Sequence, residues 1–174
     1  TNAIEQPIPA ILEYIPYRKR DGTAIRDEQM HPYWAAFGYA CVRVDMRGCG
    51  ESDGLLIDEY LQQELEDAVE VIGWLAQQDW CSGKVGMMGK SWGGFNSLQV
   101  AALRPTALKA IITVCSTDDR YADDIHYRGG ALLTENFSWA STISCYMAKS
   151  PDPLLLPETW REHWIERLQN MPLF

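Results

Sequence analysis

The hydrophobic positions of the chain fall into two kinds of run. Four short runs, rich in apolar and β-branched residues, predict strands at 10–15, 39–44, 85–88 and 108–114. Longer stretches with apolar residues at three- and four-residue spacing predict helices at 25–37, 59–77 and 95–103. The helix at 59–77 is the clearest, because its apolar residues form one stripe: Leu61, Leu65, Ala68, Val69, Ile72 and Leu75. Pro32 weakens the prediction for 25–37.

Strands and helices alternate in this pattern, and the later strands are apolar on both faces. Such a pattern predicts an α/β fold in which helices cover both sides of a parallel sheet of about four strands. The carboxyl ends of parallel strands share one edge, where ligands bind in such folds. Tyr17, Asp45, Ser91 and Cys115 each follow a predicted strand, so we expect them to crowd at that edge.

The pattern changes after Ser116. Helical and aromatic segments punctuated by prolines replace the strands, including 136–139, 143–147 and 158–168. We therefore assign residues 1–117 to the central part of the sheet core and residues 118–174 to the beginning of a helical cap insertion.

Composition excludes several classes of function. The 174 residues are 47% hydrophobic and 22% charged, as in an ordinary globular domain. A net charge of -9 without a basic patch argues against nucleic acid as a partner, and no apolar run approaches the ~20 residues of a membrane span. The five cysteines are widely spaced and do not resemble a zinc site, so we expect a reducing compartment and a cytoplasmic location.

The strongest chemical signal is Gly89-Lys-Ser-Trp-Gly-Gly94, between a predicted strand and a predicted helix. Gly-x-Ser-x-Gly in this setting predicts a nucleophile elbow, with Ser91 as the nucleophile. The backbone N–H of Trp92 would then face the developing oxyanion. The alternative is that Ser91 only caps the helix. A dehalogenase on the same fold is disfavoured, because it would carry Asp at position 91.

Two further segments complete a resemblance. Pro16-Tyr-Arg-Lys19 follows the first strand, and Asp45-Met-Arg-Gly-Cys-Gly-Glu-Ser-Asp-Gly54 follows the second. With the elbow, they resemble the cocaine-esterase and X-Pro dipeptidyl-peptidase family of α/β-hydrolases, the CocE/NonD acyl esterases, over most of residues 10–118. The resemblance implies that the Tyr17 hydroxyl binds the oxyanion; otherwise Tyr17 only packs on its loop. We expect Arg47 and Asp53 to brace the second loop.

Acidic residues follow the fourth predicted strand. Asp123 and Asp124 are candidates for binding a substrate with a free amino group, which related enzymes of this family handle. The structural alternative, which the pattern favours, is a solvated or helix-capping acidic segment. Asp118 is a weaker candidate for the acid of a catalytic triad.

A serine hydrolase also needs a histidine base. His31, His126 and His163 do not lie where the base of an α/β-hydrolase belongs, after two further strands. We therefore expect an internal fragment of a longer hydrolase, inactive alone, with apolar surface that includes Trp139, Trp160 and Trp164. Such a surface predicts self-association or cover by the remaining segments of the same protein.

The predicted function is cleavage of an ester or amide bond in a small-molecule or peptide acyl substrate, through an acyl-enzyme. This covalent, acid–base mechanism requires no metal or organic cofactor. The alternative is a non-catalytic α/β-hydrolase-like scaffold or binding protein.

Overall fold

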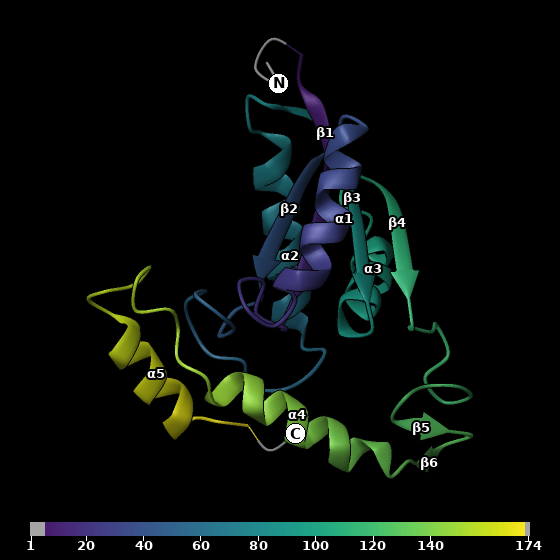
Figure 1. Ribbon diagram of the computed structural model, residues 1–174. Helices are drawn as coiled ribbons and strands as arrows, with labels where there is room; N and C mark the ends of the chain where they lie inside the picture. The colour runs from purple at the N-terminus through teal and green to yellow at the C-terminus, as the bar shows by residue number, and fades with distance from the viewer. Residues whose placement is uncertain (1–5, 173–174) are drawn as a thin grey trace.

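The computed structural model describes residues 6–172. Four strands form one parallel sheet in the order β2-β1-β3-β4 (Figure 1). Their bounds are β1 Ile8–Ile15, β2 Ala40–Asp45, β3 Cys81–Lys90 and β4 Leu108–Val114. All four predicted strands are present, so the α/β prediction is confirmed.

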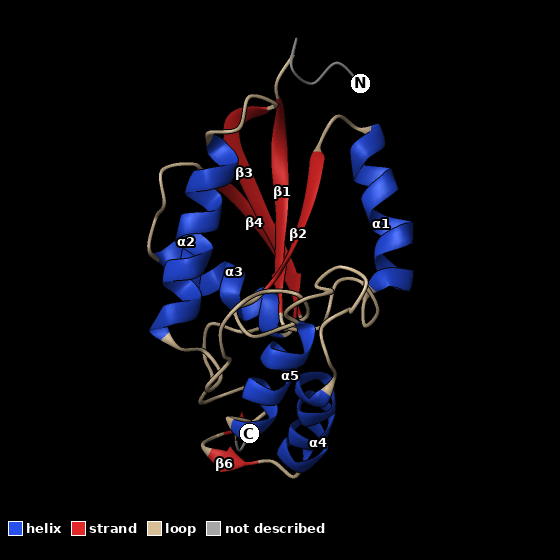
Figure 2. Cartoon of the chain, turned by 90° about the vertical axis from the view of Figure 1, so that its left-hand side faces the viewer, coloured by secondary structure: helices blue, strands red, loops and turns tan. Residues whose placement is uncertain are grey.

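Helices cover both faces of the sheet, as predicted. Figure 2 shows α1 (Ala24–Ala36) on one face, with α2 (Gln62–Ala76) and α3 (Trp92–Ala102) on the other. The helix α1 continues through Pro32, although this proline weakened the prediction of a helix here.

The hydrophobic core lies between the sheet and the pair α2 and α3. Leu12 in β1 is fully buried there, and the inward stripe of α2 meets it with Ala68, Ile72 and Leu75, none more than 1% exposed. The period of the α2 sequence therefore identified its buried face correctly. Burial of such side chains contributes on the order of 2 kcal/mol each.

On the opposite face of the sheet, beneath α1, buried carboxylates form ion pairs with arginines. Glu13 in β1 is 2% exposed and accepts a hydrogen bond from Arg26 at 2.6 Å. Asp27 is equally buried and pairs with Arg26 and Arg43. Because each buried carboxylate faces a guanidinium, this polar layer can replace apolar packing without leaving a charge unpaired.

The segment after β4 lies below the carboxyl ends of the strands (Figure 1). It contains the helices α4 (Glu135–Ala148) and α5 (Trp160–Gln169), which confirm the predicted helical pattern. It also contains a short antiparallel hairpin, β5 (Tyr127–Arg128) and β6 (Ala131–Leu132), which the sequence analysis did not predict. Among the helices that the structure describes, none combines the length and apolar character that a bilayer crossing needs.

The expectation that three cap tryptophans are exposed was wrong: all three are half-buried. Trp160 and Trp164 stack with their ring centroids 6.0 Å apart, and the Trp164 indole N–H donates to the Ala148 carbonyl at 2.8 Å. Trp139 packs against Tyr17. Other apolar side chains are exposed: Ile112 and Val114 on the edge strand β4 are about half exposed, and Phe137 and Leu154 in the cap segment are 83% and 89% exposed. Self-association therefore stays a prediction.

The turn from β3 into α3 brings two backbones into contact. A Cβ at Gly89 would lie 2.2 Å from the backbone carbon of Gly93, and backbone atoms cannot rotate aside as a side chain can. The sharp turn between them therefore requires glycine at position 89.

We predict that Gly89→Ala opens this turn and lowers the free energy of unfolding by at least about 2 kcal/mol, because the added methyl group overlaps backbone. The measurement is a urea unfolding curve. Gly73→Ala is the matched control, because nothing lies within 4 Å of its added Cβ. In the interior of α2, alanine is more favourable than glycine by up to about 1 kcal/mol. Equal stability of Gly89→Ala and the wild type would contradict the account of the turn.

Candidate active site

Ser91 occupies the turn between β3 and α3 in a strained conformation. Its φ of 55° and ψ of -119° are unfavourable for a residue with a Cβ, at a cost of about 1 to 3 kcal/mol. Hydrogen bonds on both sides hold this shape: the Ser91 N–H donates to the Val114 carbonyl at 2.8 Å, and the Ser91 carbonyl accepts from the Phe95 N–H at 2.9 Å. The side chain makes no capping hydrogen bond, which removes the alternative of a simple helix cap.

Two hydrogen-bond groups converge beside Ser91. The Trp92 backbone N–H donates to the Tyr17 hydroxyl at 2.9 Å, although the two residues lie 75 positions apart. The same hydroxyl lies 3.5 Å from the Lys90 carbonyl, to which it can donate. The structure thus brings together the three residues that the sequence analysis selected for the reaction.

The Tyr17 hydroxyl stays protonated across the physiological range. Burial raises its pKa to about 12, and hydrogen bonds with the Ser91 side chain and the Trp92 N–H only partly offset that rise. A phenol with this pKa can donate a hydrogen bond to a developing negative charge without losing its proton beforehand.

The loop that carries Tyr17 is fixed from two sides. Arg18 is 5% exposed and donates to the carbonyls of Lys149 and Ser150, at 3.3 and 2.9 Å, which also docks the end of α4. The backbone N–H and the ammonium group of Lys19 both donate to Asp45, each at 2.8 Å. These contacts tie the loop after β1 to the loop after β2 and to the cap segment.

Trp139, from α4, forms an aromatic wall over this site. Its ring centroid lies 6.2 Å from that of Tyr17 and 6.4 Å from that of Trp92. Its indole N–H donates to Glu59 at 2.5 Å, and the pKa of Glu59 is raised chiefly because the carboxyl is removed from solvent. The sequence pattern placed Trp139 on a helix but gave no signal for this contact, which depends on the position of the cap.

Ser91 and Cys115 line a cavity of about 310 Å³. Asp123 and Asp124 line the same cavity. Each faces an arginine, however. Asp123 accepts from Arg128 at 2.9 Å, and the buried Asp124 lies 3.7 Å from Arg120.

The neighbouring Asp119 has a structural role in this acidic segment. Its side chain accepts hydrogen bonds from the backbone N–H groups of Tyr121 and Ala122, at 3.1 and 3.0 Å, and so closes a turn.

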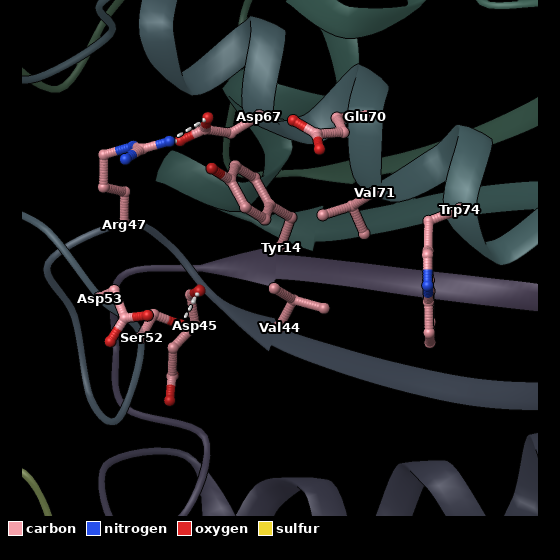
Figure 3. Close-up of a pocket in the computed structure, with 10 residues that line it drawn as sticks. All are labelled: Tyr14, Val44, Asp45, Arg47, Ser52, Asp53, Asp67, Glu70, Val71 and Trp74. Carbon is pink, nitrogen blue, oxygen red and sulfur yellow. Dashed lines mark hydrogen bonds and ion pairs between the residues drawn. The ribbon is translucent and has the colours of Figure 1, made fainter.

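A second cavity of about 420 Å³ lies beside β2 and α2 (Figure 3). Within it, Arg47 forms two hydrogen bonds of 2.7 Å with Asp67, and these bear out the expected bracing role of Arg47. The side chain of Asp53 is 89% exposed, so it braces the loop only through its carbonyl, which accepts from the Gly48 N–H at 2.9 Å.

The histidines make contacts outside the elbow. His31 lies 3.4 Å from Glu13 beneath α1. His126 contacts Asn136 and lies 3.5 Å from Glu59, and His163 lies 3.9 Å from Asp53.

One cluster has the spacing of a metal site: ligand atoms of Glu13, Asp27 and His31 lie within 4.8 Å of one another. Because Arg26 and Arg43 already neutralise its carboxylates, the arrangement fits an ion-pair network rather than a cation site.

Comparisons with known proteins agree with this geometry. The family model described as X-Pro dipeptidyl-peptidase (S15 family) matches residues 2–173. The cocaine esterase of Rhodococcus sp. (strain MB1 Bresler) is 33% identical over 141 residues, which are 79% of this chain and 24% of that protein.

Solved structures show the same fold. A CocE/NonD family hydrolase from Staphylococcus aureus aligns with 90% of this chain and 33% of its own, at a TM-score of 0.67 and 24% identity. An α-amino acid ester hydrolase aligns with 76% of this chain and 24% of its own, at a TM-score of 0.58 and 26% identity. The chain thus spans a third or less of each of these relatives. With the family model matched over nearly its whole length, the chain belongs to the X-Pro dipeptidyl-peptidase (S15) family of CocE/NonD-type α/β-hydrolases.

Proposed function

We propose that this chain supplies the nucleophile and the oxyanion-binding groups of a serine hydrolase that cleaves ester or amide bonds through an acyl-enzyme. The observation that carries the proposal is the strained conformation of Ser91, which holds its side chain beside the Trp92 N–H and the Tyr17 hydroxyl. A serine used only for structure would not need this conformation.

In the proposed reaction, the Ser91 oxygen attacks the carbonyl carbon of the substrate. Its proton passes to a histidine base, which in this fold class lies after the later strands. The carbonyl oxygen becomes an oxyanion, and the Trp92 N–H, which contacts the Tyr17 hydroxyl in the free site, donates to this oxygen. The Tyr17 hydroxyl donates a hydrogen bond to the same oxygen and keeps its proton. Collapse of the intermediate expels the leaving group, which takes the proton from the histidine, and leaves the acyl group on Ser91.

The acyl specificity is a further part of the proposal. The family model and the relatives name X-Pro dipeptides, cocaine and α-amino acid esters as the substrates of those proteins. We infer a small ester or a peptide as the substrate here. Asp123 and Asp124 are the candidates for contacting a substrate amine, which would have to compete with Arg128 and Arg120. The five free cysteines fit a reducing compartment such as the cytoplasm.

Labelling by a fluorophosphonate probe tests the role of Ser91. In the full-length protein that carries this sequence, we expect rapid labelling that maps to Ser91 after digestion, and no labelling of Ser91→Ala. Ser141→Ala is the matched control, because Ser141 lies on the exposed face of α4 and its hydroxyl donates only to the Phe137 carbonyl, and it should label normally. An unlabelled wild type would favour the non-catalytic scaffold instead.

Replacement of Tyr17 by phenylalanine tests the second oxyanion donor. We expect kcat for p-nitrophenyl acetate to fall by about 100-fold or more, because a donor to the oxyanion is lost, while KM changes by less than about threefold. Tyr33→Phe removes a hydroxyl from a residue of α1 that is 59% exposed and should leave kcat unchanged. If Tyr17→Phe turned over like the wild type, Tyr17 would have only a packing role.

A further inference from the structure

A buried carboxylate supports the residue that carries the oxyanion donor. Glu64 lies in the first turn of α2 and is 5% exposed. One of its oxygens accepts the Trp92 indole N–H at 2.9 Å, and the other accepts the Leu61 backbone N–H at 3.3 Å. Both oxygens are therefore engaged by N–H donors.

Trp92 is held at both ends. Its side chain is fully buried, with the indole against the ring of Tyr60 at 5.2 Å, and its backbone N–H points to the Tyr17 hydroxyl. The bond to Glu64 adds a directional contact to this packing and favours one rotation of the indole. Because the indole joins the backbone through Cβ and Cα, a displacement of the indole that the surrounding packing does not absorb shifts the Trp92 backbone and its N–H beside Ser91.

We propose that Glu64 is a positioning residue of the oxyanion site: its carboxylate holds the Trp92 indole and so aims the Trp92 N–H at the substrate oxygen. This inference rests on the proposed function, since it assigns Glu64 a part in aiming a group of that same reaction. A shift of about 1 Å in such a group can cost on the order of 100-fold in rate.

The two N–H donors favour the ionised form of Glu64. A carboxylate accepts at both oxygens, whereas a protonated carboxyl or a glutamine amide places a hydrogen at one of them. Burial opposes ionisation and raises the pKa of Glu64 to about 7, against the Trp92, Leu61 and Tyr60 donors, which lower it. The contact should therefore weaken as pH falls through 7.

Three other titratable groups face Glu64 or lie close to it: Tyr14 in β1, Cys49 after β2, and Glu59 before α2. Burial raises the pKa values of both Tyr14 and Cys49 far above their ordinary values, so neither changes charge near neutral pH. Burial also raises the pKa of Glu59, so the test must separate Glu59 from Glu64.

The test compares Glu64→Gln with the matched control Glu66→Gln in the full-length protein. Glu66 lies on the exposed side of the same helix and accepts only from Gln62, at 3.3 Å, so its replacement changes the same charge without touching Trp92. The substrate is p-nitrophenyl acetate. At pH 8 we expect kcat to fall about 10-fold or more in Glu64→Gln, with KM changed less than twofold. Glu66→Gln should match the wild type.

Trp92→Phe provides a second variant, since it removes the indole N–H and keeps an aromatic ring. We expect it to lower kcat, and addition of Glu64→Gln to this background should cause little further loss, because both changes break one contact. Purely additive losses would overturn the proposal. Near-UV circular dichroism of each variant separates a loss of fold from a loss of positioning.

The nitrogen–proton resonance of the Trp92 indole, assigned by its disappearance in Trp92→Phe, gives a readout that needs no turnover. It should titrate with a midpoint near pH 7 in the wild type and in Glu66→Gln, and stay flat in Glu64→Gln. A titration that persists in Glu64→Gln would assign the effect to Glu59 and overturn the proposal.

A wild type that fails to hydrolyse the ester and is not labelled at Ser91 would refute the proposed function, and this inference with it. Normal turnover by Glu64→Gln beside an active wild type would refute this inference alone.

Discussion

The site depends on the close approach of two backbones at Gly89 and Gly93. No side chain fits between the end of β3 and the start of α3, because a Cβ at position 89 would lie 2.2 Å from a backbone carbon. The chain can turn there only through a left-handed residue, and Ser91 takes that conformation at a cost of about 1 to 3 kcal/mol. Packing of the following residues offsets this cost, since Trp92 and Phe95 are both buried. The strain and the position of Ser91 at the cavity are thus two consequences of one steric constraint.

The other groups of the site are brought to this turn by contacts that are distant in sequence. Arg18 and Lys19 fix the loop of Tyr17 against the cap and against Asp45. Trp139 covers Tyr17 from α4. Each anchor is a buried or half-buried polar group with its partner in place, so the geometry beside Ser91 is held before a substrate arrives. Such preorganisation is the main source of electrostatic stabilisation in enzymes of this kind.

Periodicity predicted the strands, the helices and the stripe of α2, because these features are local. The elbow and the loop of Tyr17 were found by motif and by resemblance to a family, and the structure brought them together. Four features were not predicted. The hairpin at 127–132 is too short for a periodic signal, although Gly129-Gly130 is a turn signal that could have indicated it. Pairing of Asp123 and Asp124 with arginines, and burial of Trp139, depend on how the cap docks. Glu64 resembles an ordinary capping glutamate in its own sequence, and its partner lies 28 residues away.

The most direct test of the central claim is a crystal structure of the protein after reaction with a phosphonate ester, whose tetrahedral phosphorus imitates the intermediate of acyl transfer. Our account predicts a covalent bond from the Ser91 oxygen to phosphorus. It also predicts one phosphonyl oxygen within about 2.7 to 3.1 Å of both the Trp92 nitrogen and the Tyr17 hydroxyl oxygen. An adduct on another residue, or a phosphonyl oxygen that faces away from these two donors, would contradict it.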